Sequence, residues 1–235
     1  MGKRLRNLVV EGDQEELTKN VDKIIKQFRF ITRWIDKNVA RTEKRLILVN
    51  LLSSTSDYLE LMKSSLNSHI SVLALCTRNI YEINIRTRSL IEDQDEMAKW
   101  QSEAVTDKVQ TLEGILSLAS ESENINEQNI LKSEIDRLNG LLQKYGFPVV
   151  KQPANTGSIA YKVGQVGEHK ALFKLYSKLV HPSSYLVNDY GGASSIENQK
   201  TLQIHAQLHA HDTASRVCEQ FSIPYEVSKL QHGQA

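Results

Sequence analysis

Residues 68–91 read SHISVLALCTRNIYEINIRTRSLI and are expected to form a helix that is apolar on almost every side. A helix of that kind normally lies in the middle of a bundle. Strand signals are nearly missing from the rest of the chain, so the pattern indicates an all-α fold. The sequence therefore predicts a bundle of six or seven helices with this third helix buried at its centre. Its apolar positions are Ile70, Val72, Leu73, Leu75, Cys76, Ile80, Ile83, Ile85 and Ile91.

One polar stripe interrupts this helix, because Arg78, Glu82 and Arg86 recur at every fourth residue. A buried charge without a partner costs several kcal/mol, so each of the three must be paired or face water. The stripe can be a ladder of ion pairs at a solvent-facing helix edge. It can also line a polar pocket in which Arg78 holds an anion, Glu82 orients or deprotonates a ligand, and Arg86 assists binding.

The other helices are predicted from apolar residues that recur every three or four positions. We expect a single helical domain over 1–235, with a long irregular loop at 146–167 and a tail at 222–235. The apolar side of the second helix is assigned to Leu46, Val49, Leu52 and Leu59. The expected helices are 13–36, 42–66, 68–91, about 93 to beyond 116, 123–145, 168–180 and 196–221.

Residues 175–186 read LYSKLVHPSSYL, an amphipathic helix that ends against a proline. A residue before proline is pushed out of helical geometry, so His181 is expected at a helix end. There a protonated imidazole stabilises the negative end of the helix dipole by about 0.3–1 kcal/mol. The alternative is a site in which His181 takes and gives protons beside Arg78 and Glu82, with Tyr176 or Ser177 nearby.

Two stretches, LALCTRNIYEINIRTRSLIED (73–93) and EHKALFKLYSKLVHPSSYLV (168–187), resemble a family of bacterial all-helical proteins of unknown function. That family carries Arg-x-x-x-Glu on an apolar helix, here Arg78 and Glu82, and a later Tyr/Ser…His-Pro run. The later run corresponds to Tyr176, Ser177, His181 and Pro182 in this sequence.

The family is distantly similar to HEPN-type domains, many of which are RNA-cleaving toxins or phage-defence effectors. Their usual signature is an arginine followed after four to six residues by a histidine on one helix, and this sequence lacks it. If the chain is an enzyme, the resemblance implies a metal-independent ribonuclease. Arg78 and His181 would then have to meet across two helices.

Two further patterns have both a functional and a structural interpretation. His205 and His209 stand four residues apart in IHAQLHAHD, a spacing that can share a zinc ion, although an exposed, partly titrating helix face is the commoner outcome. A row of cations in the first helix can track phosphates or can be an ordinary solvated face. The aromatics among them, Phe28, Phe30 and Trp34, are expected in the core or an interface. The cations are Lys23, Lys26, Arg29, Arg33 and Lys37.

The net charge of +1 hides a segregation along the chain. Residues 21–45 carry eight Lys/Arg against three Asp/Glu, and residues 92–136 carry twelve acids against three lysines. This asymmetry can direct an anionic partner or join two chains, so a homodimer is expected. No apolar run is long enough for a membrane span or a signal peptide, and a cytoplasmic setting without membrane or cofactor is expected.

Three functions remain open at this stage. The first is an RNA-targeting toxin or phage-defence effector in which Arg78 holds a phosphate and His181 is the general acid or base. The second is a non-enzymatic interaction or regulatory subunit with a protein partner. The third is a binder of a small anionic ligand.

Overall fold

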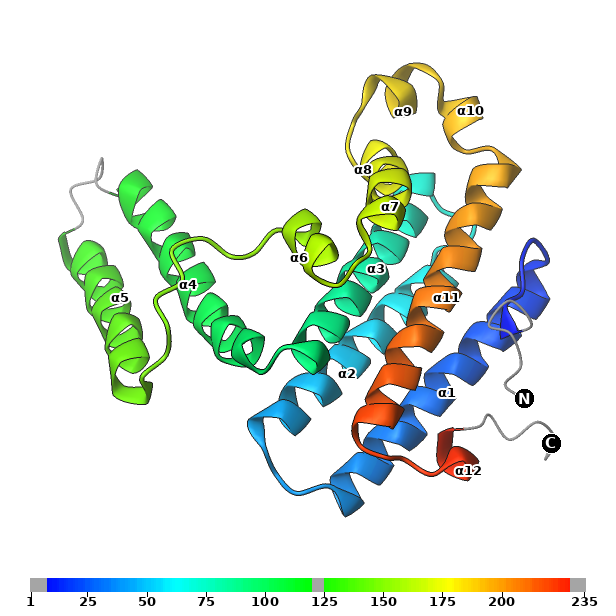
Figure 1. Cartoon of the computed structure of the whole chain (residues 1–235). Helices are drawn as coiled ribbons and strands as arrows, with labels where there is room; N and C mark the ends of the chain where they lie inside the picture. The colour runs from blue at the N-terminus through cyan, green and yellow to red at the C-terminus, as the bar shows by residue number, and fades with distance from the viewer. Residues whose placement is uncertain (1–7, 120–124, 229–235) are drawn as a thin grey trace. The chain divides into compact units, whose positions relative to one another are not determined.

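The structure, a computed structural model, describes residues 8–119 and 125–228, and within these ranges its regular elements are all helical (Figure 1). No strand occurs in the described ranges, so the predicted all-α class is confirmed. None of the helices there is both long and apolar enough to cross a bilayer.

The chain forms two compact units, where one domain was expected. Among the described residues, unit 1 comprises 8–91 and 156–228, and unit 2 comprises 92–119 and 125–155. Unit 2 is thus inserted into unit 1 between the third helix and the later helices. The first junction coincides with the start of the acidic segment at residue 92, and the second falls within the segment 146–167 that was expected as a loop.

The first two helices of unit 1 form an antiparallel pair whose starts are set by capping side chains. In α1 (Gln14–Asn38) the carboxylate of Asp13 accepts from the Glu16 N–H, and in α2 (Glu43–Ser64) Thr42 accepts from the Arg45 N–H. α1 buries an apolar stripe against α2 and α11. That stripe is Leu17, Val21, Ile24, Ile25, Phe28, Ile31 and Ile35.

The predicted apolar side of α2 is only half right. Leu52 and Leu59 are fully buried, but Leu46 is 62% exposed. α2 packs on both α1 and α11, so its buried surface is wider than a single stripe. It takes in Ile47, Leu48, Leu51, Thr55 and Met62 as well.

The third helix, α3 (Ile70–Glu92), is buried along most of its length, as predicted. It lies against α11 (Ile196–Gln220), where the Thr77 hydroxyl donates to the Leu202 carbonyl at 3.1 Å. Several small side chains of α11 are buried, and so are two of its imidazoles. The expected exposed histidine face is therefore wrong, because His209 and His211 are 5% and 6% exposed. The small residues are Ala206, Ala210 and Ala214.

Short helices fill the rest of unit 1. The segment expected as an irregular loop, 146–167, contains α6 (Thr156–Lys162) and the start of α7 (Val166–Glu168). The predicted sixth helix is composite: α7 continues through a π-helix, η2 (His169–Phe173), into α8 (Lys174–Val180). Then come α9 (Ser184–Asn188) and α10 (Tyr190–Ala193). The expected tail includes α12 (Tyr225–Ser228), which packs on α1, while 229–235 lies outside the described residues.

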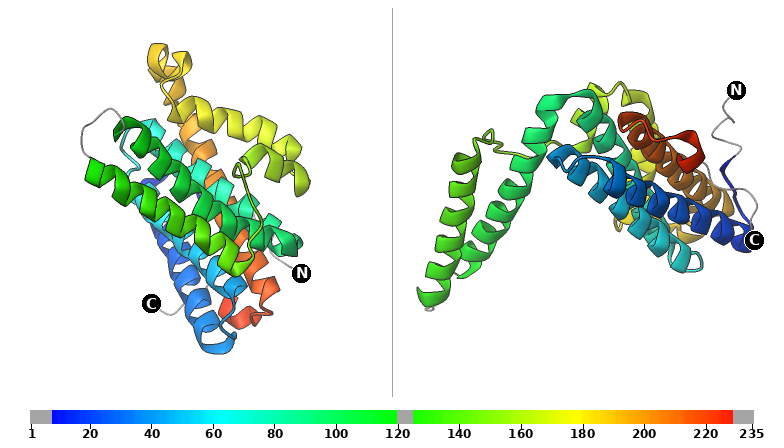
Figure 2. Two further views of the ribbon diagram at one scale, coloured as in Figure 1. Left: turned by 90° about the vertical axis from the view of Figure 1, so that its left-hand side faces the viewer. Right: turned by 90° about the horizontal axis from the view of Figure 1, so that it is seen from below.

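Unit 2 is a hairpin of α4 (Gln94–Ala119) and α5 (Ile125–Tyr145), seen from two sides in Figure 2. Gly146 follows the last residue of α5, and its φ of 63° is the left-handed conformation that glycine adopts without strain. The chain then returns along α4. There the carbonyls of Pro148, Val150 and Lys151 accept hydrogen bonds from Ser102, Thr106 and Gln110.

Candidate functional site

Arg78, Glu82 and His181 lie together on the surface of unit 1. Nε of Arg78 donates to Oε1 of Glu82 at 2.8 Å, one turn along α3. Nη1 of the same guanidinium lies 3.1 Å from Nε2 of His181, which belongs to a segment 103 residues later in the chain. Arginine has no acceptor, so the imidazole accepts through Nε2. We call these three residues the outer cluster.

The helix end predicted at His181 is what brings the imidazole to α3. His181 has extended backbone angles, φ −89° and ψ 154°, as expected before Pro182. Its N–H still donates to the Ser177 carbonyl, which closes the last turn of α8. The Ser183 hydroxyl then donates to the Lys178 carbonyl and accepts from the Leu186 N–H. One helix end thus passes directly into α9, and the predicted helix end at His181 is confirmed. Its role in proton transfer stays a prediction.

The π-helix places two rings behind the outer cluster. The Arg78 guanidinium carbon lies 4.7 Å above the centre of the Phe173 ring, within the range of a cation–π contact. Phe173 in turn stacks on His169, with ring centres 4.5 Å apart. π-helical turns cost backbone regularity and often occur at functional sites. Burial lowers the pKa of His169, and the nearby Glu82 charge opposes that shift.

A second layer of tyrosine and histidine lies deeper, between α3, α8 and α11. The Tyr81 hydroxyl is 3.2 Å from Nδ1 of His169, and the Tyr176 hydroxyl is 2.9 Å from Nδ1 of His205. Burial raises the pKa of both tyrosines, and the Glu168 charge adds to the effect. The two hydroxyls therefore stay protonated at neutral pH. The Tyr81 ring also meets His209 edge-on at 5.0 Å.

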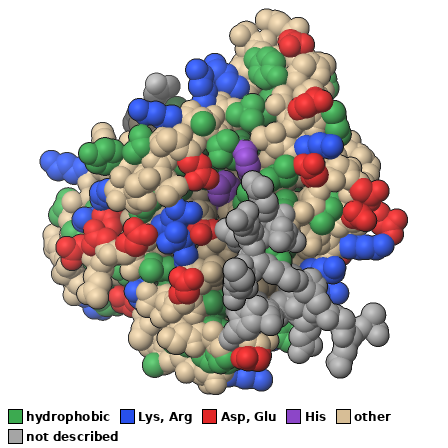
Figure 3. Space-filling model, turned by 45° about the vertical axis from the view of Figure 1, so that its right-hand side comes forward, with side chains coloured by type: hydrophobic (Ala, Val, Ile, Leu, Met, Phe, Trp, Pro, Cys, Tyr) green, Lys and Arg blue, Asp and Glu red, His purple; other side chains and the backbone are tan. Residues whose placement is uncertain are grey.

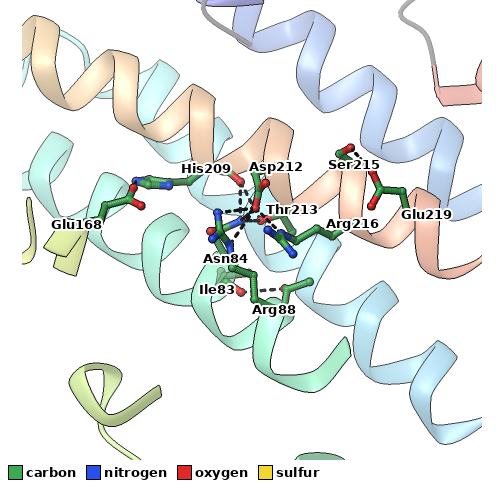
Figure 4. Close-up of polar contacts among 11 residues, drawn as sticks. Ile83, Asn84, Arg88, Glu168, His209, Asp212, Thr213, Ser215, Arg216 and Glu219 are labelled. Carbon is green, nitrogen blue, oxygen red and sulfur yellow. Dashed lines mark hydrogen bonds and ion pairs between the residues drawn. The ribbon is translucent and has the colours of Figure 1, made fainter. Parts of the chain in front are cut away.

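His209 is the most isolated polar group of this inner layer. Burial lowers its pKa to about 3, so the ring is neutral. Its Nε2 has no hydrogen-bond partner among the described residues and lies 3.8 Å from Oε1 of Glu168. Figure 4 shows the imidazole pointing from α11 toward that carboxylate.

A charged network continues from Glu168 along the crossing of α3 and α11. With its amide oriented to satisfy both neighbours, Gln165 donates to Glu168 and accepts from Arg88. Arg88 also donates to Oδ2 of Asp212 at 3.1 Å. The same oxygen accepts from Arg216 at 2.8 Å and from Asn84 at 2.8 Å (Figure 4).

The remaining predicted site residues lie away from the outer cluster or behind it. Arg86 is 9% exposed, in the buried part of α3. Tyr176 is fully buried and directed at α11, while Ser177 contributes its carbonyl to the His181 turn. His205 is bonded to Tyr176, and the described residues contain no group of three or more His, Cys, Asp or Glu placed to hold a metal.

Sequence reasoning missed His169, Phe173 and Tyr81. One signal was present, because Tyr81 is the only aromatic side chain in the helix 70–92. The π-helical turn that stacks His169 on Phe173 has no comparable signature. On the face drawn in Figure 3, acidic and basic side chains are interspersed and histidine reaches the surface between them.

Residues 45–199 match the family of unknown function DUF5677. The chain belongs to that family. The matched segment includes the outer cluster, whereas His205 and His209 on α11 follow it and α1 precedes it. No curated protein and no solved structure shows significant similarity to the chain.

Proposed function

We propose that this protein is a HEPN-like, RNA-targeting toxin or phage-defence effector that cleaves RNA without a metal at the outer cluster. The observation that carries the proposal is the 3.1 Å contact between Arg78 and His181. A guanidinium next to an imidazole can catalyse cleavage of a phosphodiester. The guanidinium balances the phosphate charge and the imidazole moves a proton. Both residues lie within the DUF5677 segment.

The reaction begins when a phosphate oxygen accepts the Nη1–H of Arg78 and so frees the lone pair of His181 Nε2. Nε2 then takes the proton of the ribose 2′-hydroxyl, and the 2′-oxygen forms a bond to phosphorus. The bond from phosphorus to the 5′-oxygen breaks, and that oxygen takes a proton from water. The hydroxide so formed takes the proton from His181 Nε2, which restores the neutral imidazole. Glu82, bound to Nε of Arg78 at 2.8 Å, holds the guanidinium toward the phosphate.

The test is cleavage of a fluorescent single-stranded RNA in the presence of EDTA. Wild type should release fragments with 2′,3′-cyclic phosphate ends, and His181→Ala should lose roughly 10²–10⁴-fold of the rate. His69→Ala is the matched control, because His69 is also an exposed histidine of unit 1 and contacts Ser71 and Tyr190 instead. Equal rates in wild type and His181→Ala would refute the proposal. Growth arrest on expression, lost in His181→Ala, tests the toxin role.

A second candidate is a non-enzymatic interaction or regulatory subunit that acts as a homodimer or with a protein partner. It is supported by unit 2, in which a two-helix hairpin leaves large apolar side chains in water. Covering them on association would be favourable. Light scattering on wild type and Ile130→Ser tests association through unit 2. A monomer in both would argue against a homodimer. The exposed residues are Ile115 (47%), Leu118 (77%), Ile125 (68%) and Ile130 (69%).

A further inference from the structure

The outward face of α1 is a cationic stripe with one aromatic ring at its centre. Lys23, Lys26, Phe30, Arg33 and Lys37 recur at intervals of three and four residues, so they share one side of the helix. All five are exposed, and Phe30 is 62% exposed. The opposite side of α1 is its buried core stripe. We call the five residues the α1 stripe.

We infer that the α1 stripe binds a single-stranded nucleic acid, with its cations on successive phosphates and a base stacked on Phe30. This adds a binding surface that holds whether or not Arg78 and His181 cleave RNA. It also lies outside the segment that matches DUF5677.

Charge on the α1 stripe is available to a ligand. In the described part of the chain its four cations form no ion pair. Three of the four acids of α1 have partners of their own: Glu15 binds Lys19, Asp22 binds Lys63 at 2.6 Å, and Asp36 binds Arg45. Even Arg29, beside the stripe, is held by Glu60 at 3.3 Å. The stripe is therefore a continuous row of positive charge.

The length of the stripe suits a short single strand. Lys23 and Lys37 are about 21 Å apart along the helix axis at 1.5 Å per residue. Each cation that replaces a condensed counterion on a single strand contributes about −0.7 to the slope of log K against log salt. Four cations give a slope of about −3, so affinity should fall about 50-fold between 50 and 200 mM salt.

Phe30 favours single-stranded nucleic acid over the other anionic ligands that a row of cations can attract. Bases stack on an aromatic ring only when they are not already stacked in a duplex, which favours single strands. Truncation of such a ring costs about 5- to 150-fold in affinity. An anionic membrane surface would require several apolar side chains along this face, and the stripe has one.

The experiment is fluorescence anisotropy of the full-length protein with a 2′-O-methyl oligouridylate 12-mer, which cannot be cleaved through its 2′-oxygen. The double variant Lys26→Gln/Arg33→Gln should bind more weakly, with a slope reduced by about 1.4. Phe30→Ala should weaken binding at every salt concentration and leave the slope unchanged. Lys108→Gln/Lys132→Gln removes two exposed lysines of unit 2 and is the matched control.

Several outcomes overturn the inference. They are the absence of oligonucleotide binding, equal losses in the stripe and control variants, an unchanged affinity in Phe30→Ala, and tighter binding to a duplex or to phosphatidylserine vesicles than to the single strand. The proposed cleavage fails separately: stripe-dependent binding of the 12-mer without cleavage of ordinary RNA would keep the α1 stripe and discard the role of His181.

Discussion

Replacement of Asp212 by asparagine tests the network that joins α3 to α11. Oδ2 of Asp212 accepts from Asn84 at 2.8 Å, from Arg88 at 3.1 Å and from Arg216 at 2.8 Å. Asparagine keeps the size of the side chain but removes its charge and turns one of its two oxygens into a donor. The guanidiniums of Arg88 and Arg216 then lose a charged acceptor. The loss matters most for Arg88, because its side chain is only 13% exposed.

The magnitude follows from the number of bonds changed. A hydrogen bond to a charged group contributes about 1.5–3 kcal/mol, and removal of one partner of a fully buried pair costs about 3–5 kcal/mol. The Asp212 side chain is 21% exposed, which places the loss lower, at about 2–4 kcal/mol. For a unit of this size each kcal/mol lowers the Tm by about 2–4 °C.

Urea unfolding followed by circular dichroism measures this loss, with Asp57→Asn as the control because Asp57 is an exposed aspartate of α2. Burial alone would raise the pKa of Asp212, but hydrogen bonds from Asn84 and Arg216 and the charges of Arg88 and Arg216 hold it below its usual value. The gap between wild type and Asp212→Asn should thus be constant above about pH 4 and shrink as pH falls through the lowered folded-state pKa. A gap under about 0.5 kcal/mol at pH 7 would refute the reasoning.

Three other changes are expected. Tyr176→Phe removes the 2.9 Å hydrogen bond between buried Tyr176 and half-buried His205 and should lower the free energy of unfolding by about 1–2 kcal/mol in urea titrations. Burial raises the pKa of Cys76 to about 11 and that of Cys218 to about 12, so Ellman's reagent at pH 8 should label both thiols in urea but neither within minutes in the native protein. Burial lowers the pKa of His209 to about 3, so between about pH 6.5 and pH 3 the unfolded chain binds a proton at His209 and the folded chain does not. Stability should therefore fall from about pH 6.5 downward, and His209→Gln should reduce that slope.

Helix positions were predictable because their signals are local. The expected helix start at 42 and helix end at 145 lie within one residue of the observed start of α2 at Glu43 and end of α5 at Tyr145. The central position of α3 was predictable because its residues are apolar on almost every side, and such a helix is normally buried in a bundle. Leu46 was misassigned because α2 packs against two partners, and a single stripe cannot describe such a helix.

The candidate site was only partly predictable, because only some of its contacts are local in sequence. Arg78 and Glu82 are neighbours on one helix, and their pairing follows from spacing alone. His181 entered through its proline and the family resemblance, yet its contact with Arg78 depends on how α8 packs on α3. The burial of His209 and the stacking of His169 on Phe173 depend entirely on packing between helices distant in sequence.

The insertion of unit 2 into unit 1 sets an order of events during synthesis on the ribosome. α1, α2 and α3 emerge first, but α11, which covers them, emerges only after the whole of unit 2 and the short helices. At about 5–20 residues per second, α3 waits roughly 6–26 s with much of its apolar surface in water. Unit 2 is contiguous in sequence and can close during that interval. We therefore expect the fragment of α1, α2 and α3 to bind a chaperone during synthesis. Chains truncated anywhere before α11 should aggregate.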